Sequence, residues 1–199
     1  MPDTGAPWNI PYVAGTDLVR DWPTDSQELA EAIADGLDEA GNAGIGSNVV
    51  QTVKTDTFST TSTSFTTVTG LTATITPTSN TSKVLLIANL MAGHTQSVGG
   101  YAFKFGGGNT SSFVGDAASN RTRAVFSLEN ADAVSDHVRL LAQTMVYLDS
   151  PSTTSATTYS VECLQINAGT LYVNRTGLDT DNSGFTRGAS SITAIEVAA

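Results

Sequence analysis

The residues whose types and spacing could do chemistry are few. Asp179, Asp181 and Ser183, followed by Gly184, match the first half of a calcium-binding loop. An EF-hand loop also needs a bidentate glutamate at its twelfth position, and Ser190 stands there instead. A plain polar loop is therefore the simpler interpretation of this segment, and we predict no metal site.

No other pattern typical of a catalytic centre is present. His94 and His137 are the only histidines, and neither has a second histidine or a cysteine nearby in the sequence, which disfavours zinc. Neither G-x-S-x-G nor the phosphate-binding G-x-x-x-x-G-K-[ST] occurs. Cys163 lies in a strand-like run without a partner, so we expect a buried hydrophobe. We predict no enzyme, no catalytic residue and no cofactor; paired carboxylates brought together by the fold are the alternative.

Charge is unevenly distributed along the 199 residues, whose formal net charge is −10. Residues 1–41 hold nine acids against Arg20 alone, whereas the remainder holds ten acids and eight bases. Nucleic-acid binding is disfavoured because a phosphate backbone needs a patch of Lys and Arg. Membrane insertion is not expected, because the longest apolar run, 84–92, is far below the roughly 20 residues that span a bilayer. The first residues lack the pattern of a secretion signal, so we expect synthesis in the cytoplasm.

Strand-like patterns dominate from residue 49 onward. Two apolar runs within 138–167 are separated by a Ser/Thr/Pro turn and alternate with period 2, which predicts a long β-hairpin. One face of the first run carries Val138, Leu140, Ala142, Val146 and Leu148, and one face of the second carries Tyr159, Val161 and Cys163.

The segment 51–82 contains 14 threonines and five serines, which also occurs in disordered stalks. The alternation of Leu71, Ala73 and Ile75 with threonines favours an ordered strand with one wet face instead. With about eight such strands, residues 49–199 are predicted to form an all-β, antiparallel β-sandwich, most simply a jelly roll.

The strand predicted at 83–92 is apolar on both faces, which a sandwich strand does not need. Its second face therefore predicts burial against another subunit. The residues expected in such an interface are Leu85, Ile87 and Met91.

The N-terminal region combines an extended peptide, a helix and a linker. Residues 1–23 contain four prolines and both tryptophans, which predicts an extended peptide that docks on a partner; packing against its own domain is the alternative. Residues 24–40 predict a short acidic helix, and 41–48 a glycine-rich linker. The helix would bury its apolar stripe in a three-helix bundle or against the β-body. The docking residues are Trp8, Ile10, Pro11, Tyr12 and Trp22, and the helix stripe is Leu29, Ile33 and Leu37.

Two long polar loops, 106–123 and 174–189, are the segments expected to contact a ligand. Their arginines and aromatic side chains are the candidate receptor contacts, and solvated charges are the alternative interpretation. These residues are Phe113, Arg121, Arg123, Arg175, Phe185 and Arg187.

Two segments resemble proteins of tailed bacteriophages. The opening NIPYVAGTDLVRDWPTDSQELAEAIADGLDEA resembles the N-terminal segments of fibre and minor tail proteins. The body, with TITPTSNTSKVLLIANL, VYLDSPSTTSATTYSVEC and ITAIEVA, resembles the distal domain of phage fibres. In the opening, the matching positions are Ile10, Pro11, Tyr12, Gly15, Thr16, Asp17 and Val19.

The resemblance implies a homotrimer with a tumour-necrosis-factor-like jelly-roll knob on a virion. Its N-terminus would be anchored in another virion protein, of the capsid, the portal or collar, or the tail, and its knob would attach to a host-surface glycan or protein. Because almost no shaft separates helix and knob, a compact spike or head fibre fits best. The alternatives are a purely structural decoration protein of the capsid and a carbohydrate-binding module outside a virus.

Overall fold

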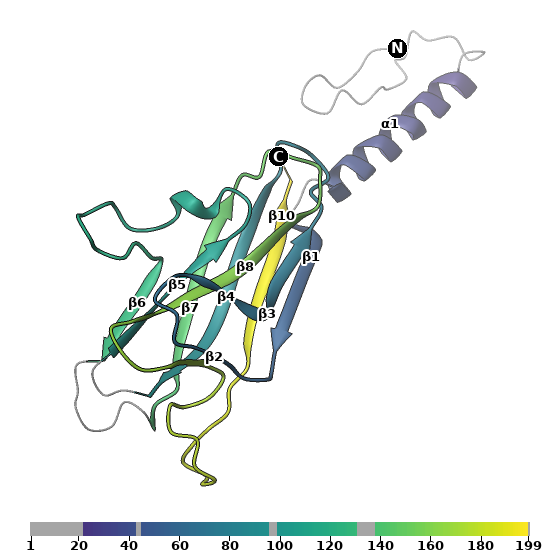
Figure 1. The fold of residues 1–199 in the computed structure, drawn as a ribbon. Helices are drawn as coiled ribbons and strands as arrows, with labels where there is room; N and C mark the ends of the chain where they lie inside the picture. Colours follow the sequence, from purple (N-terminus) through teal and green to yellow (C-terminus); the bar gives the residue numbers. More distant parts are fainter. Residues whose placement is uncertain (1–21, 43–44, 96–98, 131–137, 199) are drawn as a thin grey trace. The chain divides into compact units, whose positions relative to one another are not determined.

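The computed structural model describes residues 22–42, 45–95, 99–130 and 138–198 (Figure 1). The chain divides into two compact units, Met1–Ser47 and Asn48–Ala199. The predicted docking residues Trp8, Ile10, Pro11 and Tyr12 lie outside the described residues, as does His137. The predicted helix and the predicted β-body fall in separate units.

The first unit contains α1 (Trp22–Asn42), which extends two residues beyond the predicted helix at each end. Pro23 stands in its first turn, where a missing backbone N–H costs nothing. Trp22, predicted as part of the extended peptide, is thus the first residue of the helix. Among its apolar stripe, Ile33 is 45% exposed and Leu37 is 68% exposed. Residues of the helix itself therefore do not cover the stripe.

The second unit is a sandwich of two antiparallel sheets, as predicted (Figure 1). In the first, called the β4 sheet, β4 is flanked on one edge by β7 and on the other by β10 and β9, with β1 and β2 beyond them. The second, called the β8 sheet, has the order β3-β8-β5-β6. The connections β1–β2, β5–β6 and β9–β10 stay within one sheet, and the other connections cross to the opposite sheet. The β4-sheet strands are β1 (Ile45–Lys54), β2 (Phe58–Thr60), β4 (Lys83–His94), β7 (Leu141–Asp149), β9 (Leu171–Val173) and β10 (Ser190–Val197). The β8-sheet strands are β3 (Thr66–Ile75), β5 (Gly99–Gly106), β6 (Phe126–Asn130) and β8 (Thr157–Ile166).

The core lies between the sheets and is built by alternate residues of each strand. On β3, Leu71, Ala73 and Ile75 are buried and the threonines between them are exposed, so the predicted strand with one wet face is confirmed. The aromatic rings of β5 are all buried, and those of Tyr101 and Phe103 meet edge to face at 5.6 Å. The regular alternation leaves each sheet with a separate outer face.

The predicted hairpin over 138–167 is wrong. β7 pairs with β4, whereas β8 pairs with β3 and β5, so the segment 150–156 crosses from one sheet to the other. Period-2 alternation marks a strand but does not identify its neighbour. Ala142, Val146 and Leu148 do share one face of β7, as predicted, and that face points outward, because Met145 is buried while Val146 is 51% exposed.

The predicted linker 41–48 is too long, since β1 already begins at Ile45. Asn48 joins three elements there. Its side-chain amide donates to the Thr76 carbonyl oxygen at 2.8 Å and to the Glu196 carboxylate at 3.2 Å. The end of the glycine-rich segment is therefore part of the β4 sheet, because it pairs there as β1.

Glu196 of β10 links that strand to Thr78 in the segment that follows β3. One oxygen of its buried carboxylate accepts hydrogen bonds from the backbone N–H and the hydroxyl of Thr78, both at 2.7 Å. Burial raises the pKa of Glu196, but the hydrogen bonds from Thr78 and Asn48 outweigh burial and hold the pKa below its ordinary value. This carboxylate therefore stays ionised inside the joint between the two sheets.

Candidate functional site

The outer face of the β4 sheet is apolar over four neighbouring strands. Val49 and Val53 of β1 are 52% and 55% exposed, and Val146 and Leu148 of β7 are 51% and 44% exposed. Between these strands lie half-buried side chains of β4 and β10. We call this surface the apolar face; it consists of Val49, Val53, Leu85, Ile87, Val146, Leu148 and Ile195.

The pairing registers place these side chains in rows. Leu85 stands opposite Ile195 on one side and Leu148 on the other. In the neighbouring row, Ile87 of β4 stands opposite Val146 of β7. Because directly opposite residues of an antiparallel pair touch, the rows form one continuous surface rather than scattered exposed residues.

One polar pair borders the apolar face, and another lies within it, between Val49 and Val53. The Thr144 hydroxyl donates to the Asn89 side-chain oxygen at 2.9 Å, and the Gln51 amide donates to the Thr193 hydroxyl at 2.9 Å. None of the outward side chains at the alternate positions 49–53, 85–91, 142–148 and 191–197 is charged. Isolated monomers rarely expose an uncharged apolar surface of this kind, so this face has the character of a protein–protein interface.

The predicted interface residues fall into two groups. Leu85 and Ile87 lie on the apolar face, and Met91 lies further along the same side of β4, opposite Ala142. Leu29, Ile33 and Leu37 lie in the other unit, on α1. Sequence reasoning missed the contributions of β1, β7 and β10, although the valines of β1 and the alternation in SITAIEV are visible in the sequence.

The loop after β5 is held by internal contacts. Phe113 stacks on Tyr147 with ring centroids 4.4 Å apart and lies 6.4 Å from the Phe105 ring. Gly107 has a φ of +83°, and a Cβ there would collide with the Thr158 carbonyl oxygen, so the glycine permits a close approach to β8. Phe113, predicted as a receptor contact, thus serves to anchor the loop.

Further along the same loop, Arg121 and Arg123 are exposed. The Arg123 Nε donates to the Gly115 carbonyl oxygen at 2.6 Å, and the Gly115 N–H donates to the Ala124 carbonyl oxygen at 3.1 Å. These two bonds close the loop at its base. Of the predicted receptor contacts, these arginines are the two whose guanidinium groups have no carboxylate partner among the described residues.

In the loop 174–189, both predicted arginines are ion-paired. Asp179 accepts from Arg175 at 3.2 Å and from Arg187 at 2.6 Å, and the Arg175 guanidinium also lies 3.8 Å from the Tyr172 ring centre. Phe185 is half-buried. The carboxylate considered for calcium is therefore paired with two cations, and no three His, Cys, Asp or Glu side chains form a metal-binding group within the described residues.

Buried titratable groups take part in packing. The Tyr159 hydroxyl donates to the buried Asp149 carboxylate at 2.7 Å, and burial together with that bond raises the pKa of Tyr159. Burial raises the pKa of the Cys163 thiol to about 12. A thiol with so high a pKa is a poor nucleophile, which agrees with its expected role as a small buried hydrophobe.

The comparisons with known proteins are few. No family model and no curated protein matches the chain. Among solved structures, a match is to a chain in a structure of infectious bursal disease virus, Gx strain, with 16% identity and a TM-score of 0.35. It covers 77% of this chain and 37% of the viral one, so this chain spans well under half of that protein. Among the described residues, no helix has the length and hydropathy needed to cross a bilayer.

Proposed function

We propose that the chain is a structural virion protein: the trimeric fibre or spike of a tailed bacteriophage. Its N-terminal peptide is anchored in another virion protein, and its tumour-necrosis-factor-like knob is displayed for attachment to a host-surface glycan or protein. The proposal rests on the resemblance of the opening and the body to phage fibres and on the apolar face.

The apolar face carries the argument for self-association. Burying apolar surface contributes about 25 cal/mol per Å², so an uncovered face of seven aliphatic side chains represents several kcal/mol available for association. A second copy suits this face because the surface is uncharged. Two identical knobs can therefore meet there without bringing like charges together.

The helix supports the same assembly independently. Leu29, Ile33 and Leu37 recur every four residues, and six acids of α1 lie among its other positions. A single amphipathic helix is marginal alone in water, whereas parallel copies would bury the stripe and leave the acids in solvent. Both units of one chain thus present an apolar surface that other copies would cover.

A decoration protein of the capsid, without host attachment, is the second candidate. It is favoured by the loop 174–189, where Arg175 and Arg187 are both neutralised by Asp179 rather than presented to a ligand. Binding of a host glycan by the purified protein would separate the two functions.

The mass of the purified full chain in solution tests the assembly. Light scattering is expected to give three times the chain mass of 20.6 kDa for the full chain, and three times the mass of the fragment itself for residues 48–199. A monomeric full chain would contradict the proposal. A trimeric full chain with a monomeric 48–199 fragment would assign the assembly to the helix and remove the apolar face from the argument.

A further inference from the structure

Two adjoining hollows lie on the loop that follows β5. One has a volume of about 280 Å³ and is lined by polar and charged residues, including Asp116, Arg121 and Arg123. The other, of about 240 Å³, is lined mainly by Phe113, Val114 and other apolar residues. They share Gly115, Ala124 and Val125. Each is slightly smaller than a typical small-molecule pocket, which begins at roughly 300 Å³, so a ligand of ordinary size would occupy both.

The polar hollow is lined by two arginines that make no ion pair within the described residues, together with Asp116. Within the described part of the knob, four other cations are ion-paired with carboxylates, Arg139 has an interaction of its own, and Lys83 stands without an ion pair outside both hollows. Arg121 and Arg123 have no carboxylate partner, and both line the same hollow. The four paired cations are Lys54, Lys104, Arg175 and Arg187.

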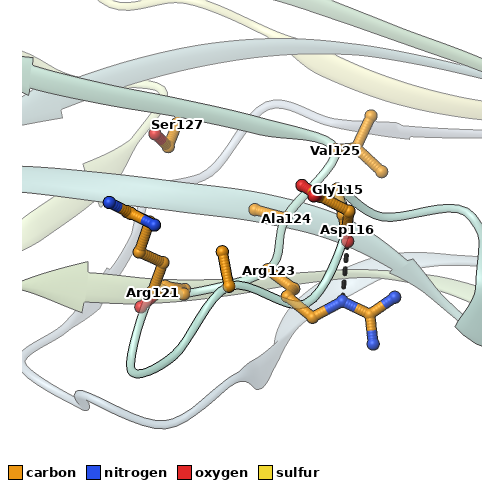
Figure 2. A pocket seen from close by; sticks show the side chains of 9 residues that line it. Gly115, Asp116, Arg121, Arg123, Ala124, Val125 and Ser127 are labelled. Carbon is orange, nitrogen blue, oxygen red and sulfur yellow. Dashed lines mark hydrogen bonds between the residues drawn. The ribbon is translucent and has the colours of Figure 1, made fainter.

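The Arg123 side chain is already oriented. Its Nε is bound to the Gly115 carbonyl oxygen, which leaves both terminal nitrogens available (Figure 2). In Figure 2 the two guanidinium groups extend in different directions, so they frame the hollow instead of converging on one point. A planar guanidinium with two free N–H donors is suited to bind a carboxylate in a bidentate manner.

The loop itself is rigid enough to keep this arrangement. The Val125 N–H donates to the Phe103 carbonyl oxygen at 3.0 Å, the Arg121 N–H donates to the Ala118 carbonyl oxygen at 3.1 Å, and the Phe113 ring is stacked on Tyr147. A site ordered before the ligand arrives loses less conformational entropy on binding.

From this arrangement we infer that the two hollows form a binding site for a sugar acid that carries an N-acyl group. Arg123 holds the carboxylate, and Arg121 adds positive charge. Asp116, Thr122 and Ser127 are placed to bond sugar hydroxyls, and the apolar hollow takes the acyl methyl group. The inference rests on the proposed host-attachment function and specifies the class of ligand that this loop would recognise.

The test uses the full chain and three related sugars, followed by saturation-transfer NMR titration. N-acetylmuramic acid has both the carboxylate and the acetyl group, N-acetylglucosamine lacks the carboxylate, and glucuronic acid lacks the acetyl group. We expect N-acetylmuramic acid to bind at least tenfold more tightly than either of the others, because each lacks one of the two matched groups. Equal binding of all three, or of none, would overturn the inference.

Three variants assign the contacts. Arg123→Gln is expected to weaken binding of N-acetylmuramic acid about tenfold, and Arg121→Gln about threefold with a reduced salt dependence. Lys83→Gln removes the same charge at the start of β4, outside both hollows, and should change nothing. Arg123→Gln also removes the bond to Gly115, whereas only the backbone of Arg121 bonds within the loop. Arg121→Gln therefore remains informative if Arg123→Gln disturbs the loop.

The mass of the same sample distinguishes the two hypotheses. A trimer that binds none of the sugars overturns the binding site and leaves the proposed assembly intact. A monomer that binds N-acetylmuramic acid with the expected selectivity upholds the binding site and contradicts the trimeric assembly. Selective binding that is unchanged in both arginine variants would place the ligand elsewhere and overturn the inference.

Discussion

The two outer faces of the sandwich present opposite kinds of side chain. On the β8 sheet the exposed positions carry threonine and serine, the Thr74 and Thr158 hydroxyls are 2.8 Å apart, and Lys104 pairs with Glu162 at 3.1 Å. On the β4 sheet most outward positions carry valine, leucine and isoleucine, with the polar residues Gln51, Asn89, Thr144 and Thr193 between or beside them. One face is therefore suited to water and the other to a protein surface.

The two faces show that the residues needed to form a strand are not the same as the residues that favour burial. Threonine, valine and isoleucine are all β-branched and all favour strands, so either face is compatible with a well-formed sheet. They differ in the free energy of exposing the side chain to water. The requirements of the strands therefore do not by themselves explain the aliphatic residues on the outer face of the β4 sheet.

The largest expected effect comes from a charge placed on the apolar face. Ile87→Asp should convert the trimer to a monomer, because burying an unpaired carboxylate in an interface costs several kcal/mol. Light scattering measures the result. Thr74→Asp places the same charge on the β8 sheet and should leave the mass unchanged. If both variants stay trimeric, the two faces do not differ in function.

A smaller effect is expected at the joint between the sheets. Glu196→Gln should lower the free energy of unfolding by about 2 kcal/mol, the cost of losing charge-assisted hydrogen bonds. Chemical denaturation measures this difference.

The same variant also has a predicted pH dependence. Because the pKa of Glu196 is lowered in the folded state, its stabilisation is complete above the ordinary glutamate pKa and is lost as the pH falls below it. The gap in stability between the wild type and Glu196→Gln should therefore shrink below about pH 4.5. A gap that stays constant down to pH 3 would show that the ionised form contributes nothing.

The helix stripe should contribute less than the apolar face. Ile33→Ser is expected to weaken self-association at least tenfold, since each buried isoleucine contributes roughly 1.5–3 kcal/mol. Sedimentation across a concentration series measures the change. Gln27→Ser, on the exposed part of the same helix, is the matched control. An effect as large as that of Ile87→Asp would make the helix, and not the sheet, the main site of assembly.

The smallest effect is expected on the polar face. Thr74→Ala removes the contact with Thr158 and should cost no more than about 1 kcal/mol of unfolding free energy, without any change in mass. Thermal denaturation together with light scattering measures both quantities. A loss of assembly would show that the β8 sheet also meets a partner.

The sequence alone was sufficient to predict the class of fold and part of the apolar face. Alternation of Leu71, Ala73 and Ile75 with threonines predicts a strand because side chains of a strand point to opposite faces in turn. The second apolar side of 83–92 predicts Leu85 and Ile87 as interface residues. Aliphatic side chains on both faces of one strand are buried only if each face packs against another surface. Both predictions use only local periodicity.

Strand partners depended on the tertiary structure. The run 157–166 follows 141–149 directly, yet the two lie in different sheets. The period of a strand contains no information about its neighbour, so the sequence places Val146 and Leu148 on one face of a strand without deciding that this face points outward. Their place on the apolar face became visible only once β7 was paired with β4.

The two polar loops show the same difference between what the sequence predicts and what only the structure reveals. From the sequence, Arg121, Arg123, Arg175 and Arg187 are equivalent exposed cations in two polar segments. In the structure, Asp179 neutralises two of them, whereas the other two frame a hollow. Local pattern determined that this chain forms strands, which of them are apolar and where its polar loops lie, because those properties depend on neighbouring residues. Only the tertiary structure decided which face is uncovered and which charges are free, because both depend on contacts between residues far apart in the chain.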